Sequence, residues 1–537
     1  MSQVTPSPLF EPQDSSTQSR LQPRVKRSFE IRGIGVRVMS GPWLMVLALV
    51  GIVILGLAIR LVGLSRIGFN TDEAVYAGQA AGILNDADLK PYFPVFRAHP
   101  LLFQFILALT YSVTGISDTV GRSVSVVIGV MTVLAVFALG RSLYSTRVGL
   151  LAALFMALMP YHVVVTRQVI LDGPMTLFAT LTLCALAHYA RVQSSRWLYA
   201  TGLCLGLTFL AKETGIILLA AVYLFLALSP SIKVRLIDLG IATLLCGLLV
   251  SVFPLVISLA GAVRTGQSYL VWQLLRQPNH DWAFYAMTVV PMMGVLLVWS
   301  AIAGISLRWQ QRTWRETLLL AWIFVPTVFF QVWAVKGFQY LLPITPALAV
   351  LGAVTFVGTA DGAALQLRLG KRDVALAVAS RWKVLGAVVV AVSLALPSWY
   401  FVQTTPNTYG LAGTGGLTGG RETGLWFKQN TPKDAQVLAI GPSIANLIQF
   451  YGHRKTHMLS ISPNPLQRNP AYDPVDNPNL RLRNGEFHYI VWDVYSASRS
   501  QFFSDKLAAF VKQFNGRIVH TEVVDGKDAI VVYEVHP

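Results

Sequence analysis

The feature that most constrains this chain is a series of long apolar runs, the first of which extends from Pro42 to about Gly63. A helix of about 20 apolar residues is long enough to cross the hydrocarbon core of a bilayer. The chain is 54% hydrophobic and only 13% charged, with a mean hydropathy of +0.55, which is far too apolar for an ordinary soluble protein. The sequence therefore predicts a polytopic α-helical membrane protein.

The basic residues predict how these runs cross the membrane, because Lys and Arg accumulate in cytoplasmic loops. The stretch 99–114 is apolar but short, and counting it as a span would place most basic loops outside. We therefore expect it to be an interfacial or re-entrant helix. The result is about eleven spans in the plasma membrane, with a cytoplasmic N-terminus. After the first, the spans are predicted at residues 120–140, 148–165, 171–190, 197–211, 214–229, 237–260, 285–307, 316–334, 340–360 and 384–402.

Composition changes along the chain predict its domains. A Ser-, Gln- and Pro-rich start is typical of a disordered tail, and a Gly- and Thr-rich segment after the last span is typical of a linker. Beyond it, short apolar runs alternate with helical periodicity, which favours a small soluble α/β domain. The predicted parts are a cytoplasmic tail at 1–40, a transmembrane domain at 41–402 with a first outer loop at 64–115, a linker at 403–421 and an extracytoplasmic domain at 422–537.

In the soluble part we expect helices near 422–430, 444–451 and 496–514, and strands near 436–440, 488–492, 517–524 and 528–535. The last two strands flank a turn at Asp525-Gly526.

Several classes of site are not supported. The net charge of +17 comes from short basic clusters between apolar runs, which orient a membrane protein and predict no nucleic-acid partner. The three cysteines, at positions 184, 204 and 246, all lie in apolar segments, so no disulfide framework is predicted. The nine histidines show no ligand-like spacing. We therefore predict no metal site, and a divalent cation as cofactor stays an open alternative.

Ten polar residues nevertheless fall at or near the outer ends of the predicted spans, and this is where we place a candidate site. A carboxylate there can remove a proton from an acceptor hydroxyl, and cations can stabilise a departing phosphate. The ten are Asp72, Glu73, His99, Arg122, Arg167, Asp172, Lys212, Glu213, Lys336 and Tyr340.

Asp72 is the best candidate for the base, because it begins the acidic pair that follows the first span. The alternative is that Asp72 caps the helix that starts near Glu73. Asp172 either orients the acceptor or pairs with Arg167, five residues earlier.

Lys212 and Glu213 interrupt a long apolar stretch, so they either line a cavity or neutralise each other at a helix end. Lys336 either binds a phosphate or snorkels, extending its ammonium group to the membrane interface. Tyr340 either contributes to the same phosphate site or belongs to the interfacial aromatic belt.

Taken in order, these residues resemble a known family. The motifs are Asp72-Glu73 with Tyr76, His99-Pro100-Leu101-Leu102, Arg122, Arg167 with Asp172, Lys212-Glu213, and Lys336-Gly-Phe-Gln-Tyr340-Leu-Leu-Pro343. Over about residues 40–360 the chain resembles the bacterial and archaeal relatives of the dolichyl-phosphate-mannose protein O-mannosyltransferases and of the lipid A aminoarabinose transferase.

The resemblance implies the type C glycosyltransferase fold and an enzyme that moves a sugar from a polyprenyl-phosphate donor to a hydroxyl on the extracytoplasmic face. It implies that Asp72 acts on the acceptor, that Glu73 shapes the site and that Asp172 is a second acid. His99, Lys336 and Tyr340 are implied to contact the lipid phosphate. Related sequences often have Lys-Pro-Pro-Leu where this chain has His99, so a permanent cation is replaced by one that depends on pH. A single displacement with Asp72 as base predicts inversion at the anomeric carbon, and the acceptor is a protein, lipid or glycan.

A secondary transporter or lipid flippase is the main alternative, since it is also polytopic and carries intramembrane charges. It predicts two related halves with paired broken helices, and the sequence shows no such repeat. A receptor with a ligand-binding tail leaves the outer charges unexplained.

Overall fold

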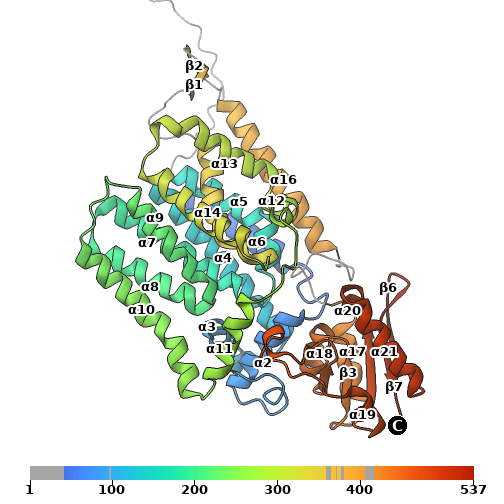
Figure 1. Ribbon diagram of the computed structural model, residues 1–537. Coiled ribbons are helices and arrows are strands. Elements are labelled where there is room, and N and C mark those ends of the chain that lie inside the picture. Colours follow the sequence, from blue (N-terminus) through green and yellow to red (C-terminus); the bar gives the residue numbers. More distant parts are fainter. Residues whose placement is uncertain are drawn as a thin grey trace, which may run out of the picture. The chain divides into compact units, whose positions relative to one another are not determined.

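The protein is described by a computed structural model that covers residues 42–95, 98–357, 365–369, 372–376, 380–404 and 417–536 (Figure 1). The predicted tail at 1–40 and most of the predicted linker at 403–421 lie outside these residues. The helices of the N-terminal, mainly helical part are α1 (Pro42–Leu61), α2 (Thr71–Ile83), α3 (Leu102–Thr114), α4 (Asp118–Leu143), α5 (Thr146–Leu158), α6 (Pro160–Val165), α7 (Asp172–Val192), α8 (Ser195–Ala211), η1 (Glu213–Ile216), α9 (Ile217–Ala227), α10 (Leu236–Leu259), α11 (Val263–Leu274), η2 (Tyr285–Val289), α12 (Val290–Met293), α13 (Val295–Arg308), η3 (Trp309–Gln311), α14 (Trp314–Val332), η4 (Phe338–Ile344), α15 (Thr345–Val357) and α16 (Ser380–Gln403).

Each predicted span coincides with helix, but the predicted number of eleven is not confirmed. By length and composition, seven helices in the described part of the chain can cross a membrane, or eight if one bent pair counts as a span. In that pair η2 and α12 meet α13 at an angle of 88°, where Gly294 has a φ of +92° that favours glycine. Lys212 likewise separates α8 from η1 with an extended backbone. These breaks leave helices too short to span alone.

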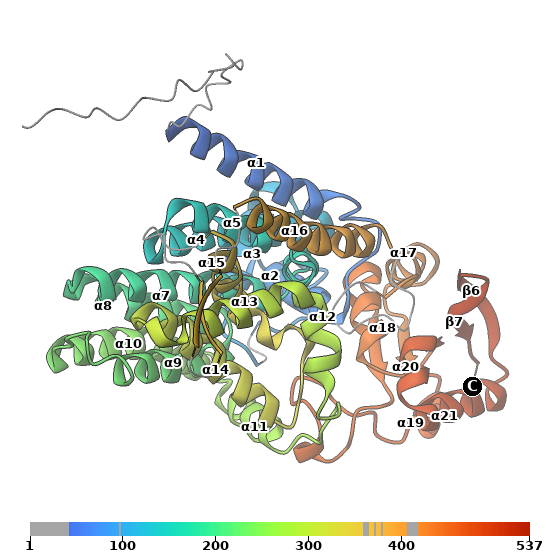
Figure 2. The same ribbon diagram turned by 90° about the horizontal axis from the view of Figure 1, so that it is seen from above.

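The helices pack closely through small residues. In both views α7, α8 and α10 lie side by side (Figure 1 and Figure 2). A Cβ atom on Gly202 of α8 would lie only 2.1 Å from the carbonyl oxygen of Ala242 in α10. At this crossing the two backbones touch, as is common where helices associate in lipid.

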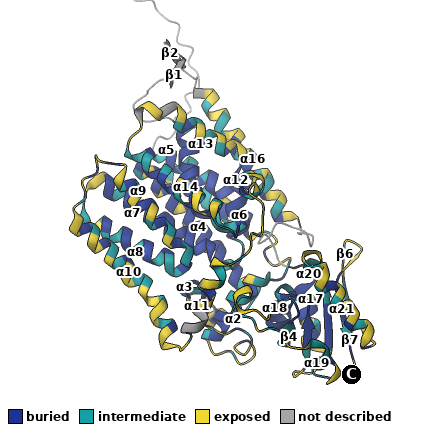
Figure 3. Ribbon diagram, in the orientation of Figure 1, coloured by how far each residue is buried: buried dark blue, intermediate teal, exposed yellow. Residues whose placement is uncertain are grey.

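Burial separates inner from outer helices (Figure 3). The apolar segment that contains α15 is 78% buried, whereas the corresponding segments of α10 and α16 are 11% and 17% buried. The exposed side chains of α10 and α16 are mainly apolar, and such surface is compatible with a lipid environment. The protein is therefore a multi-pass membrane protein with α15 near its centre.

Two elements were not predicted. The segment between the spans at 237–260 and 285–307 contains the helix α11. The loop before α16 contains an antiparallel hairpin of β1 (Leu365–Leu369) and β2 (Arg372–Leu376).

The C-terminal domain, residues 417–536, is a small α/β sandwich of helices around one sheet. Its sheet has the strand order β4-β3-β5-β7-β6. β3 is parallel to β4 and β5, whereas β7 is antiparallel to β5 and β6. The strands are β3 (Gln436–Ala439), β4 (Lys455–Met458), β5 (Tyr489–Asp493), β6 (Arg517–Val524) and β7 (Lys527–Glu534), and the helices are α17 (Gly420–Asn430), α18 (Pro442–Leu447), η5 (Ile448–Gly452), η6 (Pro465–Gln467), α19 (Pro478–Arg483), α20 (Val494–Arg499) and α21 (Gln501–Gln513).

Most of the elements predicted for this domain are present, including the turn between β6 and β7. Asp525 and Gly526 have φ values of +52° and +73° there, as a tight hairpin turn requires. Sequence patterning missed the short strand β4, and the helix predicted at 496–514 is divided between α20 and α21.

Candidate functional site

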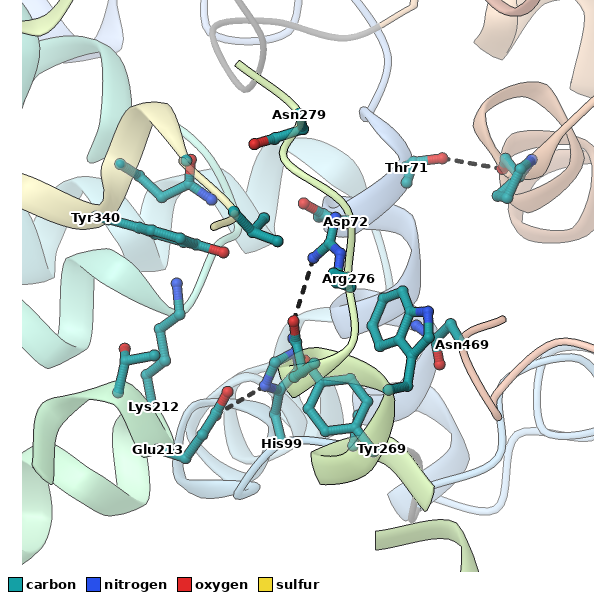
Figure 4. Close-up of a pocket in the computed structure, with 18 of the residues that line it drawn as sticks. Thr71, Asp72, His99, Lys212, Glu213, Tyr269, Arg276, Asn279, Tyr340 and Asn469 are labelled. Atoms are coloured by element: carbon teal, nitrogen blue, oxygen red, sulfur yellow. Dashed lines mark hydrogen bonds and ion pairs between the residues drawn. The ribbon is translucent and has the colours of Figure 1, made fainter. Parts of the chain in front are cut away.

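A cavity of about 1300 Å³ lies between the helical part and the C-terminal domain. Its walls come from α2, the segment around His99, the break between α8 and η1, α11 with the loop after it, and the segment before η4. The C-terminal domain supplies a further wall. Charged and polar side chains from these separate elements converge on one space (Figure 4). Six of the ten predicted residues line it: Asp72, His99, Lys212, Glu213, Lys336 and Tyr340.

Asp72 presents a free carboxylate to this cavity. Its side chain is accessible, and no described residue forms a hydrogen bond or ion pair with it. The capping role is filled by Asn70, whose Oδ1 accepts a hydrogen bond of 2.9 Å from the backbone N–H of Glu73. Enclosure by the protein raises the pKa of Asp72, while the nearby His99 and Lys212 oppose that rise.

His99 and Glu213 form an ion pair on the cavity wall (Figure 4). Nδ1 of His99 lies 2.8 Å from Oε2 of Glu213, and Nε2 lies 3.4 Å from the hydroxyl of Tyr269. Both ring nitrogens of His99 therefore have partners within the protein.

Lys212 is bonded to Asp172 rather than to Glu213, its neighbour in the chain. Nζ of Lys212 lies 2.8 and 2.9 Å from the two carboxylate oxygens of Asp172, and both side chains are buried. The same ammonium lies 4.8 Å from the ring centre of Tyr340. The Lys212–Asp172 pair therefore holds Tyr340 in place. Asp172 itself does not line the cavity.

Lys336 is a buried cation without a carboxylate partner in the part of the chain that the structure describes. Its Nζ lies 5.2 Å from the ring centre of Trp282. The side chain of Asn279 holds the backbone of Lys336 through two hydrogen bonds of 2.8 Å, one to N–H and one to C=O. Asn279 and Trp282 of the loop after α11 thus fix the position of this lysine.

Glu73, Arg122 and Arg167 do not line the cavity, although we had placed them in the site. Arg122 donates to both carboxylate oxygens of Glu73 at 2.7 and 2.8 Å and also to the carbonyls of residues 64, 67 and 68. Arg167 donates to the carbonyls of residues 59, 60 and 62 at the end of α1. Arg122 thus connects the start of the first outer loop to α4, and Arg167 connects the end of α1 to the segment after α6.

The cavity also contains residues that sequence reasoning missed. Arg276 follows α11, stacks on Trp272 at 4.7 Å and has no carboxylate partner among the described residues. The signal for it was a basic residue in a segment otherwise treated as a loop. Arg468, Asn469 and Arg499 line the cavity from the C-terminal domain, and the sequence held no signal that this domain faces the site.

No three His, Cys, Asp or Glu side chains within the described ranges come close enough together to hold a metal ion.

Comparisons with known proteins agree with this architecture. Residues 98–258 match the model of the family described as dolichyl-phosphate-mannose-protein mannosyltransferase. The fold is similar to that of ArnT from Cupriavidus metallidurans in the apo state, with a TM-score of 0.68 and 13% identity over 91% of this chain and 97% of that chain. For the same protein bound to undecaprenyl phosphate, the TM-score is 0.63 and the identity 15% over the same shares.

The archaeal oligosaccharyltransferase AglB from Archaeoglobus fulgidus, in complex with an inhibitory peptide and a dolichol-phosphate, has a TM-score of 0.51 and 12% identity over 92% of this chain and 74% of that chain. No curated protein sequence matches the chain.

Proposed function

Because this chain has the type C glycosyltransferase fold that its motifs led us to expect, we propose that it transfers a sugar from a polyprenyl-phosphate donor to an acceptor hydroxyl. The observation that carries the proposal is the free carboxylate of Asp72 in the same cavity as Lys336 and Arg276, two cations that have no carboxylate partner among the residues that the structure describes. These groups come from three separate elements. A base and an anion site in one cavity are what such a transfer requires.

In this proposal Asp72 removes the proton of the acceptor hydroxyl. Its carboxylate has no hydrogen-bond or ion-pair partner within the described ranges, and its raised pKa makes it a stronger base than an ordinary aspartate. As the acceptor oxygen bonds to the anomeric carbon, the bond from that carbon to the phosphate oxygen breaks, and the electron pair leaves with the phosphate. One displacement inverts the anomeric configuration.

The departing lipid phosphate is held by Lys336 and Arg276. Tyr340, whose ring contacts Lys212, lines the same cavity (Figure 4). Undecaprenyl phosphate bound to ArnT and dolichol-phosphate bound to AglB support this class of donor. The Lys212–Asp172 and His99–Glu213 pairs orient the walls in this scheme. Glu73, Arg122 and Arg167 support the first outer loop. The site faces the extracytoplasmic side, in agreement with the distribution of basic loops.

The test is release of lipid phosphate from a polyprenyl-phosphate sugar by the purified protein. We expect Asp72→Asn to bind the donor normally but to lower transfer by at least about 100-fold, since it removes the general base. Asp88→Asn is the matched control, because this aspartate lies in the same outer loop, is 61% exposed, and its contact of 3.3 Å with Nδ1 of His453 is one that the amide can keep. Undiminished turnover by the Asp72→Asn variant excludes Asp72 as base, and movement of the intact donor across vesicles without release of lipid phosphate points to a transporter.

A further inference from the structure

The C-terminal domain turns the carboxyl ends of its parallel strands toward the cavity. Because β3 is parallel to both β4 and β5, these three strands end at one edge of the sheet. Each of the three strands is followed by residues that line the cavity: 442–443 after β3, 460–462 after β4, and Tyr495 and Arg499 in α20 after β5. Ligands of open α/β sheets bind outside the carboxyl ends of the strands.

The strand order places a crevice at this edge. From β3 the chain goes to β4 on one side and then crosses to β5 on the other side, so the connections after β3 and β5 diverge. A Cβ atom on Gly441 would lie 3.2 Å from Oγ of Ser460 and 3.6 Å from Oγ of Ser496. The hydroxyl groups of Ser460, after β4, and of Ser496, after β5, therefore lie close to the backbone that follows β3.

Two arginines, Arg468 and Arg499, lie on the same wall of the cavity. Arg468 donates to the carbonyls of Ser462 and Pro463, and Arg499 donates to the hydroxyl of Tyr495 at 2.9 Å. Neither guanidinium forms an ion pair with any residue the structure describes. Arg499 lies close enough to His280, on the opposite wall, to add to the lowering of the pKa of His280 that burial causes. Most guanidinium N–H groups of this pair stay available to an anion.

This wall is joined directly to the residue before the proposed base. Oγ1 of Thr71 lies 2.9 Å from the carbonyl oxygen of Pro442 and 3.1 Å from that of Ser443 (Figure 4). Thr71 also begins α2, in which Asp72 follows. A ligand on the strand edge would therefore lie next to Asp72, in the cavity that Lys336 also lines.

We propose that the carboxyl edge of β3, β4 and β5 is the acceptor subsite, and that the acceptor is a carbohydrate with an anionic group that Arg468 and Arg499 bind. The hydroxyls at the strand ends contact its neutral part, and the hydroxyl that receives the sugar faces Asp72. The place of this subsite in catalysis rests on the proposed function, whereas the binding it predicts does not.

The experiment titrates the full-length protein in detergent with three small probes and detects binding by saturation-transfer NMR. The probes are glucose 6-phosphate, glucuronate and glucose, which separate a phosphate from a carboxylate and from a neutral sugar. We expect at least one anionic probe to bind about tenfold or more tightly than glucose, and Arg468→Gln and Arg499→Gln each to weaken that binding about tenfold. Arg499→Lys keeps the charge and retains part of the affinity. Arg483→Gln, an exposed arginine of α19 outside the cavity, leaves binding unchanged.

A second titration with a short-chain polyprenyl phosphate assigns the arginines to acceptor or donor. We expect Arg468→Gln and Arg499→Gln to leave its binding unchanged. Equal loss of polyprenyl phosphate binding overturns the inference, because the arginines then belong to the donor site. Equal binding of neutral and anionic probes, or unchanged binding by both variants, also overturns it. If the wild-type protein binds an anionic probe as expected but releases no lipid phosphate from a donor, the proposed function fails while this subsite stands.

Discussion

Asp72 and Glu73 are adjacent residues with opposite environments. Successive residues of an α-helix point about 100° apart, so Asp72 and Glu73 at the start of α2 face different surroundings. Glu73 points inward, where Arg122 and two backbone N–H groups saturate its carboxylate. Asp72 points into the cavity and has no partner among the described residues. The acidic pair thus divides into one structural carboxylate and one available for chemistry.

The pH dependence of transfer tests the second of these roles. Asp72 must be ionised to act as base, and its pKa is raised by desolvation within the cavity, so transfer is expected to fall as the pH drops through a value above the usual pKa of about 4 for aspartate. His99 opposes this rise. His99→Gln removes that cation and should move the acid limb of kcat/KM to higher pH. An acid limb that stays in place or disappears in this variant contradicts the assignment of Asp72 as the base.

How much of the site the sequence predicts depends on what each side chain contacts. Lys336 and Tyr340 could be found from their position after an apolar run, because position relative to the membrane is a local property. Arg122 and Arg167 occupy similar positions, but they bind backbone carbonyls of the first outer loop and of α1. Whether an arginine faces a cavity or a chain end depends on tertiary packing, which a single sequence does not display.

The helical elements were predictable because a span is defined by a continuous apolar run. α11 is less apolar and is short, so it resembles a loop in composition. β4 has only four residues and pairs with a strand 19 positions earlier in register, and such pairing leaves little local pattern. The breaks at Lys212 and Gly294 follow from a charged pair and a glycine, and the first of them ends α8 beside the cavity.

The contact between α8 and α10 leads to a prediction about helix packing. Gly202→Ala places a methyl group against the backbone of Ala242, so we expect a loss of about 1–3 kcal/mol in stability from overpacking. The measurement is thermal unfolding in detergent. Gly240→Ala, in α10 with open space around the glycine, is the matched control and should be neutral or slightly stabilising. Equal midpoints for both variants show that the helices are not in close contact.

Across the whole molecule, the C-terminal domain and the first outer loop behave as one structure. The hydroxyl of Tyr451 accepts a hydrogen bond of 2.8 Å from the N–H of Phe69 and donates one of 3.0 Å to Asp118. Arg421 adds an ion pair of 3.1 Å to Asp118. Residues 118 and 451 are 333 positions apart, so no local pattern could predict their contact. The soluble domain, expected as a separate unit behind a linker, helps to place α2 and with it Asp72.

Tyr451→Phe tests this connection, because it removes one hydroxyl from the joint and leaves the ring in place. The buried N–H of Phe69 then lacks a partner, which costs about 1–3 kcal/mol. We expect faster hydrogen exchange at Phe69 and at the start of α2, together with slower transfer at unchanged donor binding, because Asp72 is less well held. Tyr533→Phe removes a hydroxyl of β7 for which no described partner is present and should change neither measurement. If exchange at α2 is the same in both variants, the C-terminal domain covers the cavity without positioning the base, and the link from Tyr451 to catalysis is refuted.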